Sequence, residues 1–205
     1  MFSSPFNKRI CYIHVAKCGG TAIVDALKKQ YRLRDRLLRK SSFVHLHPAA
    51  SLRSSQIFHE DLWTYREKLF IYFLSNEANR FMTGHFPFSD LAMRHFKDEW
   101  NFITILRHPV DRWFSHYFFN RYKEADHFKT NLSLEAHLKS EDGKSLGSLY
   151  HKIFYGSYYD ETADPQEAYS KVIRNIDSLA WVGVLEHMDI FCRDFSNTFG
   201  TELKV

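Results

Sequence analysis

Two adjacent glycines, Gly19 and Gly20, separate an apolar run from an amphipathic run near the start of the chain. Glycine is scarce in this sequence, with 8 residues among 205, so an adjacent pair needs a structural reason. The apolar run from Ile10 to Ala16 is typical of a buried strand, and the run that opens at Thr21 has apolar residues at the helical spacing. The segment therefore predicts a strand, a glycine turn and a helix. In that arrangement, the N–H groups at the helix start can surround an anion.

Apolar runs and helix-like segments alternate along the rest of the chain. Further strands are predicted at Phe102 to Leu106 and at Leu179 to Leu185, with a shorter candidate at Arg80 to Thr83. The other helices that we expect start at Pro109 or span Gln166 to Ile176 and Asp189 to Phe199. This order favours the α/β fold class with a mainly parallel sheet. Because no linker or repeat divides the sequence, we expect residues 1–205 to form a single domain.

Lys17 and Thr21 flank the glycine turn and provide side-chain groups that can bind an anion. In open parallel sheets, ligands bind beyond the carboxyl ends of the strands, where this turn lies. Lys17 adds a positive charge and Thr21 a hydroxyl, so the turn is suited to a phosphate. It is not a Walker A loop, because the GxxxxGK[ST] pattern places the lysine after the second glycine. The alternative is a plain tight turn with a solvated lysine.

Arg107, Ser115 and His85 follow other predicted strands. Arg107 ends one strand, and the planar fork of its guanidinium suits a phosphate. Ser115 lies about two turns into the following helix, from which its hydroxyl can reach the same crevice. His85 comes directly after Gly84, and an imidazole with a pKa of ~6.5 suits a general base. The alternatives are a structural ion pair for Arg107 and a structural or exposed imidazole for His85, which is one of 12 histidines.

The segments that carry these residues resemble those of the sulfotransferases that use 3′-phosphoadenosine 5′-phosphosulfate (PAPS), in particular the branch of the uronosyl 2-O-sulfotransferases of heparan sulfate and related glycosaminoglycans. His14 to Thr21 is similar to that family's 5′-phosphosulfate loop, and Leu106 to Tyr117 to its 3′-phosphate motif. Thr83 to Phe86 is similar to the segment with the catalytic histidine, and Trp181 to Glu186 to a late strand. The resemblance spans nearly the whole chain and implies a P-loop-like three-layer fold, with the sheet flanked by helices.

The resemblance also implies a reaction and a role for each residue. A sulfuryl group would pass in line from PAPS to a hydroxyl acceptor, a glycan or small molecule with carbohydrate favoured, and would leave adenosine 3′,5′-bisphosphate (PAP). His85 is the implied general base, and Lys17 the implied catalytic cation at the bridging oxygen. The implied 5′-phosphate site consists of Lys17, Cys18, Gly19, Gly20, Thr21 and Ala22, and the implied 3′-phosphate site consists of Arg107 and Ser115. No metal is expected. The aromatic stretch Tyr150 to Tyr159 is a candidate acceptor site, although we favour core packing for it.

The sequence departs from the family pattern at several positions. Ala16 and Cys18 stand where the family usually has Pro and Thr, so one hydroxyl donor is lost. His108 replaces a common Asp beside Arg107, which changes the local ion pairing. Because the chain stops at Val205, soon after the last similar segment, we expect a domain that is truncated at its C-terminus.

Two other functions stay open. An ATP-dependent P-loop kinase is disfavoured by the displaced lysine and by the lack of a clear metal-binding acid after a strand. A non-catalytic nucleotide- or polyanion-binding module would use the stretch Lys28 to Lys40, where seven cationic residues accompany Asp35. We favour a solvated helix face for this stretch. We also expect no nucleic-acid partner, because such proteins usually have a stronger basic bias than a net charge of +4.

Neither a membrane span nor a disulfide framework is expected. The longest clean apolar run, Leu69 to Leu74, is far shorter than the ~18 residues that a spanning helix needs. Three cysteines without a CxxC pair favour a reducing compartment. We therefore expect a soluble cytoplasmic protein, with a soluble catalytic fragment of a Golgi membrane enzyme as the alternative. The sequence carries no signal for a particular oligomeric state.

Overall fold

Parallel strands form a single sheet in the part of the chain that the structure describes. The structure, a computed structural model, describes residues 9–38, 42–126, 128–156, 162–199 and 203, with the backbone alone at 30–38 and 199. The strands are β1 (Arg9–Ile13), β2 (Phe43–Leu46), β3 (Phe81–Gly84), β4 (Trp100–Leu106) and β5 (Trp181–Val184). Their order in the sheet is β2-β3-β1-β4-β5, and every neighbouring pair is parallel.

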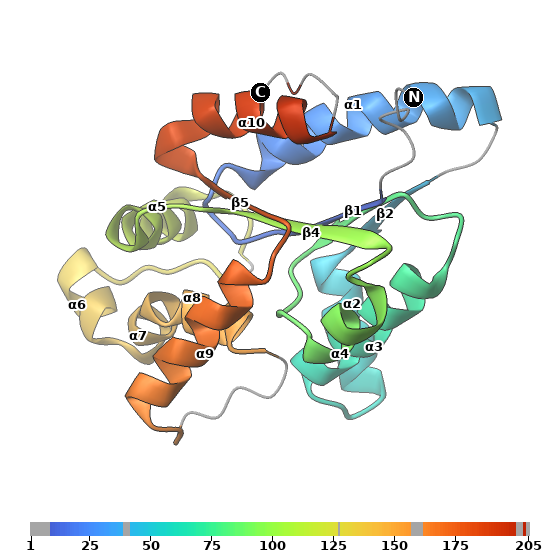
Figure 1. Ribbon diagram of the computed structural model, residues 1–205. Helices are drawn as coiled ribbons and strands as arrows, with labels where there is room; N and C mark the ends of the chain where they lie inside the picture. Colours follow the sequence, from blue (N-terminus) through green and yellow to red (C-terminus); the bar gives the residue numbers. More distant parts are fainter. Residues whose placement is uncertain (1–8, 39–41, 127, 157–161, 200–202, 204–205) are drawn as a thin grey trace.

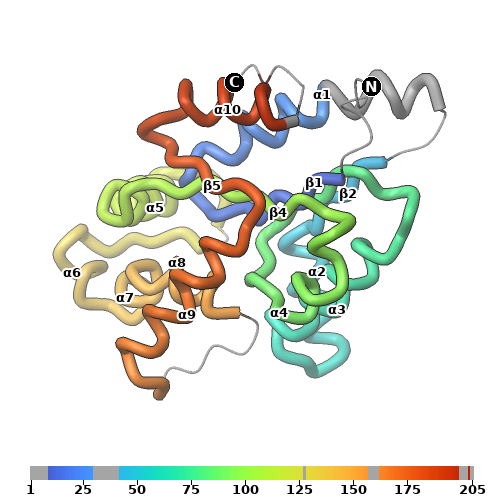
Figure 2. The backbone as a smooth tube through the Cα atoms, viewed as in Figure 1, coloured from blue at the N-terminus to red at the C-terminus, as the bar shows by residue number. Residues whose placement is uncertain are grey.

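Helices cover both faces of the sheet and so produce three layers (Figure 1). One face carries α1 (Gly20–Leu38) and α10 (Met188–Phe199), and α5 (Pro109–Tyr122) lies beyond the end of β4. The opposite face carries α2 (Pro48–Ile57), α3 (Leu62–Ser75), α4 (Asp90–Phe96), α6 (Leu134–Lys139), α7 (Glu141–Gly147), α8 (Leu149–Phe154) and α9 (Pro165–Asp177). In the backbone trace, the connection from β4 to β5 places α6 to α9 on the face away from α1 and α10 (Figure 2). The predicted α/β, P-loop-like three-layer class is confirmed.

The central strands are buried on both sides, which explains their continuous apolar composition. All five residues of β1 are buried, as are most of those in β4. Parallel strands covered by helices on both faces have this pattern. Arg9 is buried with them because its charge is satisfied: Nη1 donates to Glu99 Oε2 at 2.7 Å and Nε donates to the Asn79 carbonyl at 3.1 Å.

The strands predicted from the sequence are all present, with shifted ends. β1 ends at Ile13 instead of Ala16, because the chain leaves the sheet for a turn in which Lys17 has φ 69°. β5 is shorter than predicted, because the N–H of Leu179 donates to the Ile176 carbonyl and Leu185 opens a short 3₁₀ helix, η2 (Leu185–His187). Pro109 is the first residue of α5, as predicted.

The parallel register aligns the carboxyl ends of the strands. Gly84 of β3 pairs with Leu46 of β2 and with Ile13 of β1, and Ile13 pairs with Thr104 of β4. Leu106, at the end of β4, pairs with Val184 of β5. The residues that follow each strand therefore emerge at one edge of the sheet.

The basic stretch Lys28 to Lys40 falls mainly outside the described side chains. Its backbone continues α1 as far as Leu38. Lys28 is described, and its Nζ lies 4.5 Å from the centroid of the Phe43 ring. Across the described ranges, none of the helices has the length and apolar composition needed to span a membrane.

Candidate active site

A cavity of about 540 Å³ opens at the carboxyl edge of the sheet. Its walls come from the turn after β1 and the start of α1, from the ends of β3 and β4, from α5 and from η2. The lining residues are His14, Ala16, Lys17, Gly19, Gly20, Thr21, Ala22, His85, Arg107, Ser115, Phe119 and Leu185. The structure thus brings every predicted site residue except Cys18 to one cavity.

The turn after β1 has the backbone geometry of an anion cradle. Lys17 and Gly19 have φ angles of 69° and 74°, which turn the chain sharply into α1. A Cβ at Gly20 would lie 2.3 Å from His14 Nε2, so only glycine fits at the first position of the helix. Helix N–H groups that lack a partner within the helix can then face the cavity, where the helix dipole also favours an anion.

Lys17 supplies a cation beside this cradle. Its Nζ lies 4.0 Å from the centroid of the Phe119 ring on α5, a cation–π contact that holds the ammonium at the cavity wall. Burial lowers the pKa of Lys17, and the nearby Arg107 guanidinium lowers it further. Two cations that follow different strands therefore share the cavity, which favours a ligand with more than one negative charge.

Arg107 lies at the end of β4 and is partly paired. Its Nε is 4.0 Å from Glu186 Oε1, and 29% of the Arg107 side chain is exposed. The same carboxylate oxygen accepts the N–H of His108 at 3.0 Å, which lowers the pKa of Glu186 more than Arg107 does. The contact with Glu186 is long, so the guanidinium fork keeps donors for a ligand. Ser115 lines the same cavity from α5.

His85 is held in one tautomer. Its Nδ1 lies 2.8 Å from the carbonyl oxygen of His14. Because a carbonyl can only accept, Nδ1 carries the proton and Nε2 of the neutral ring has the free lone pair. Burial lowers the pKa of His85; the bond to His14 opposes this shift and the charge of Arg66 adds to it. At neutral pH the imidazole is uncharged, as a general base must be.

Cys18 points into the interior instead of the cavity. Its Sγ lies 3.5 Å from Tyr150 Oη, and burial raises the pKa of the thiol. Tyr150 Oη also accepts the N–H of Arg107 at 2.9 Å and donates to the Arg107 carbonyl at 2.6 Å. Tyr150 therefore links the turn after β1 to the end of β4. This agrees with the core role favoured for its aromatic stretch, of which residues 157–159 lie outside the described residues.

Sequence reasoning missed several residues that shape the cavity. His14 was noted only as part of the loop, yet it contacts His85 through its carbonyl and its ring. Phe119 follows Ser115 by one helical turn, a spacing that places both on one face of α5. Leu185 packs against Gly19, where its Cδ1 would lie 2.6 Å from an added Cβ. Only the spacing of Phe119 offered a signal in the sequence.

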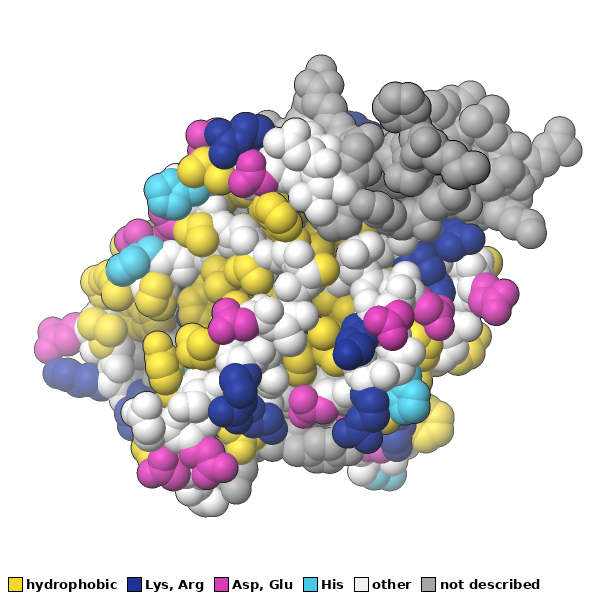
Figure 3. Space-filling model, viewed as in Figure 1, with side chains coloured by type: hydrophobic (Ala, Val, Ile, Leu, Met, Phe, Trp, Pro, Cys, Tyr) yellow, Lys and Arg dark blue, Asp and Glu magenta, His cyan; other side chains and the backbone are white. Residues whose placement is uncertain are grey.

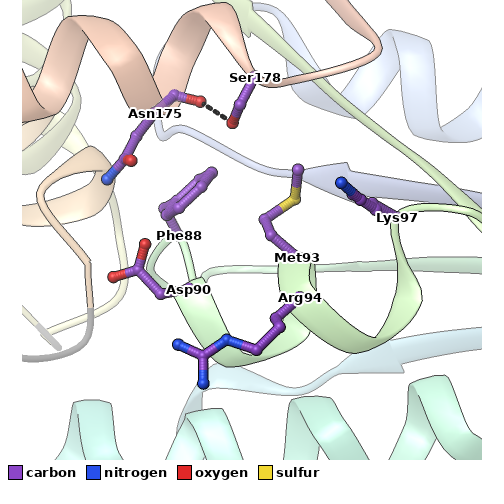
Figure 4. A pocket seen from close by; sticks show the side chains of 7 residues that line it. All are labelled: Phe88, Asp90, Met93, Arg94, Lys97, Asn175 and Ser178. Carbon is purple, nitrogen blue, oxygen red and sulfur yellow. Dashed lines mark hydrogen bonds between the residues drawn. The ribbon is translucent and has the colours of Figure 1, made fainter.

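A second hollow, of about 570 Å³, lies between α4 and α9 (Figure 4). Phe88 and Met93 give it an apolar wall, and Arg94 and Lys97 extend from the α4 side. None of the predicted site residues lines this hollow. On the face drawn in Figure 3, charged side chains are scattered over α4 and α9, whereas hydrophobic ones gather at the end that holds α5. The carboxyl-edge cavity, with its loop, cations and histidine, is therefore the candidate active site.

Several histidines surround this site, but the described side chains of His, Cys, Asp and Glu include no group of three that could hold a metal ion. Comparisons with known proteins assign no family to the chain. No model of a known protein family matches it, and no curated protein is significantly similar to it.

Proposed function

We propose that the protein is a PAPS-dependent sulfotransferase that acts on a hydroxyl acceptor, with carbohydrate as the favoured acceptor class. One observation carries the proposal: a single cavity is lined by the anion cradle with Lys17, by the second cation Arg107 and by His85. The Nε2 atom of His85 is unprotonated in the neutral ring and can therefore accept a proton. PAPS has two anionic ends, the 5′-phosphosulfate and the 3′-phosphate. The cradle suits the first end, and Arg107 with Ser115 suits the second.

The chemistry of the transfer suits these side chains. The acceptor oxygen would form a bond to sulfur while the bond from sulfur to the bridging phosphate oxygen breaks, and PAP would leave with the electron pair. His85 Nε2 would take the acceptor proton. The Lys17 ammonium would stabilise the charge that develops on the bridging oxygen. Positioning and charge stabilisation of this kind supply most of the catalysis in related phosphoryl transfers.

The state of the cysteines also fits a reducing compartment, and we propose that the enzyme is cytoplasmic. Cys11, Cys18 and Cys192 are all free thiols. Disulfides are rare in cytosolic proteins and common in secreted ones.

A ligand-binding experiment separates this function from the two alternatives. We expect PAP to raise the melting temperature by roughly 5–10 °C at about 100 times its dissociation constant, which corresponds to ~2.7 kcal/mol in a chain of this size. ATP with Mg²⁺ and heparin would be tested in parallel. Stabilisation by ATP with Mg²⁺ alone would indicate a kinase, and stabilisation by heparin alone would indicate a polyanion-binding module.

His85→Ala tests the catalytic assignment. We expect transfer from PAPS to fall by roughly 10²–10³-fold or more, since general-base catalysis contributes ~10²–10⁴. PAP affinity, measured by calorimetry, should change little. His95→Ala, at an exposed histidine on α4, is the matched control. Unchanged turnover in His85→Ala would remove His85 from the role of base.

A further inference from the structure

Three aromatic rings stack in a row that leads from the core to the candidate active site. The rings of Tyr12 and His14 have centroids 5.6 Å apart with 24° between their planes. The rings of His14 and His85 are 4.6 Å apart with 27° between their planes. Tyr12 is fully buried, so the inner end of the stack is fixed by the core, and His85 at the outer end lines the cavity.

The ring of His14 has no room to move toward the anion cradle. A Cβ at Gly20 would meet His14 Nε2 at 2.3 Å and Cδ2 at 2.4 Å, so the ring lies directly against the first residue of α1. Burial, with smaller contributions from the neighbouring His85 and His45, lowers the pKa of His14 to about 3. The ring is therefore uncharged near neutral pH. A neutral flat ring can stack on an imidazole without repelling the proton that a base accepts.

His14 thus contacts His85 in two independent ways. Its carbonyl accepts the Nδ1 proton of His85, which leaves Nε2 as the basic nitrogen. Its ring covers one face of the His85 imidazole and keeps water away from that face. The carbonyl contact survives any substitution at position 14, whereas the ring contact depends on the side chain.

We propose that His14 is a positioning residue for His85: its carbonyl fixes the tautomer, and its ring, wedged between His85 and Gly20, fixes the direction in which Nε2 points. What Nε2 then does rests on the proposed sulfotransferase function. The orientation of His85 does not depend on that function, so the two ideas can fail separately.

The first test follows the His85 ring by nitrogen NMR in the free protein, without any substrate. In the unaltered protein we expect the Nδ1-protonated tautomer and a pKa below ~6.5. The groups that face His85 are His14 directly after β1, His45 on β2, Arg66 on α3 and His116 on α5. Because those other groups remain in place, His14→Ala should raise the His85 pKa toward its ordinary value by admitting water.

Two variants and one control sharpen this test. His14→Phe restores a flat ring, so the His85 pKa should return most of the way toward that of the unaltered protein. Gly20→Ala pushes on the His14 ring, which is wedged between Gly20 and His85, and should therefore move the His85 ring signal away from its position in the unaltered protein. His95→Ala on α4 removes an exposed imidazole as a control. Identical His85 titrations in all of these proteins would overturn the proposal.

The second test uses turnover. We expect His14→Ala to lower kcat by roughly 10–100-fold with little change in the KM for PAPS, because a small misplacement of a catalytic group costs about this much. The acidic limb of the pH–rate profile should move to higher pH, and His14→Phe should recover part of both effects. If PAPS is no substrate but the NMR shifts occur, the proposed function fails and the positioning role stands. If PAPS is turned over and His14→Ala behaves like the unaltered protein, the positioning role fails.

Discussion

Two neighbouring arginines have different roles because one follows a strand and the other lies in a helix. Arg107 directly follows β4, and Arg112 lies five positions later in α5. Arg107 is partly exposed and lines the cavity. Arg112 is 1% exposed, donates from Nη2 to the Leu146 carbonyl and lies 5.2 Å from the Tyr150 ring centroid. Arg107 can therefore bind an anion, whereas Arg112 is packed in the interior beside Tyr150.

Arg107→Ala should separate nucleotides by their 3′-phosphate. We expect the affinity for PAP to fall by roughly 10–100-fold, because a hydrogen bond to a charged group contributes ~1.5–3 kcal/mol. The affinity for adenosine 5′-phosphate, which lacks the 3′-phosphate, should fall much less. Calorimetry measures both affinities, and Arg94→Ala, at an exposed arginine on α4, is the matched control. Equal losses for the two nucleotides would contradict the 3′-phosphate assignment.

At the scale of elements, β5 and α10 pack through a position that only glycine can occupy. Gly183 is buried in the middle of β5, and a Cβ there would lie 2.2 Å from Cδ2 of Phe191 on α10. Phe191 is itself 2% exposed, so its ring has little space to retreat. This contact seats the last described strand and helix against the sheet, beside the η2 segment that lines the cavity.

Gly183→Ala should therefore destabilise the fold. We expect a loss of about 1–3 kcal/mol in the free energy of unfolding, the usual cost of overpacking a core. Phe191→Leu should relieve the clash, so that the double variant is more stable than the sum of the single losses predicts. Urea unfolding measures each value. Gly147→Ala is the control, because an added Cβ there meets no atom within 4 Å; a similar loss in that variant would show that the clash is not the cause.

The predictability of each element follows from how strongly its residues are buried and capped. β1, β4 and β5 were predicted because they carry apolar runs, and α5 because Pro109 marks its start. β2 was missed since it is a four-residue edge strand with an exposed His45 and no continuous apolar run. The helices α2 to α4, α7 and α8 were also not predicted, and α2 is only weakly amphipathic by burial, with Ser51 and Ser55 as its buried residues.

In the candidate site, the positions of residues at strand ends could be predicted from the sequence, but the contacts of their side chains could not. Strand ends in a parallel sheet share one edge, so the sequence placed Lys17, Arg107 and His85 together correctly. The sequence contains no side-chain directions within the turn, so the contact of the Cys18 thiol with Tyr150 could not be predicted; the assignment of Cys18 to the anion cradle rests on its backbone N–H and stays a prediction. The contact between His14 and His85 spans 71 positions and depends on the register of β1 with β3, which no local pattern contains.

At the scale of the whole molecule, partly buried histidines couple stability to pH. Burial is the main cause that lowers the pKa of His14 to about 3 and that of His116 to about 4, and nearby cations contribute to the shift of His116. His116 Nδ1 is buried with no hydrogen-bond partner among the described residues. In the unfolded chain a histidine titrates near ~6.5. The unfolded chain therefore binds more protons between pH ~6.5 and ~4, so stability falls as the pH falls through this window.

We expect the free energy of unfolding to drop by about 2–3 kcal/mol between pH 6.5 and 5, since each such histidine contributes up to ~1.4 kcal/mol per pH unit. Urea unfolding at fixed ionic strength across this range measures the slope. His116→Phe removes one of the two groups and should reduce the slope by about half of that contribution. His95→Ala removes an exposed imidazole and is the control. A slope that His116→Phe leaves unchanged would mean that His116 is not held neutral in the folded protein, and the drop would have to arise from other groups.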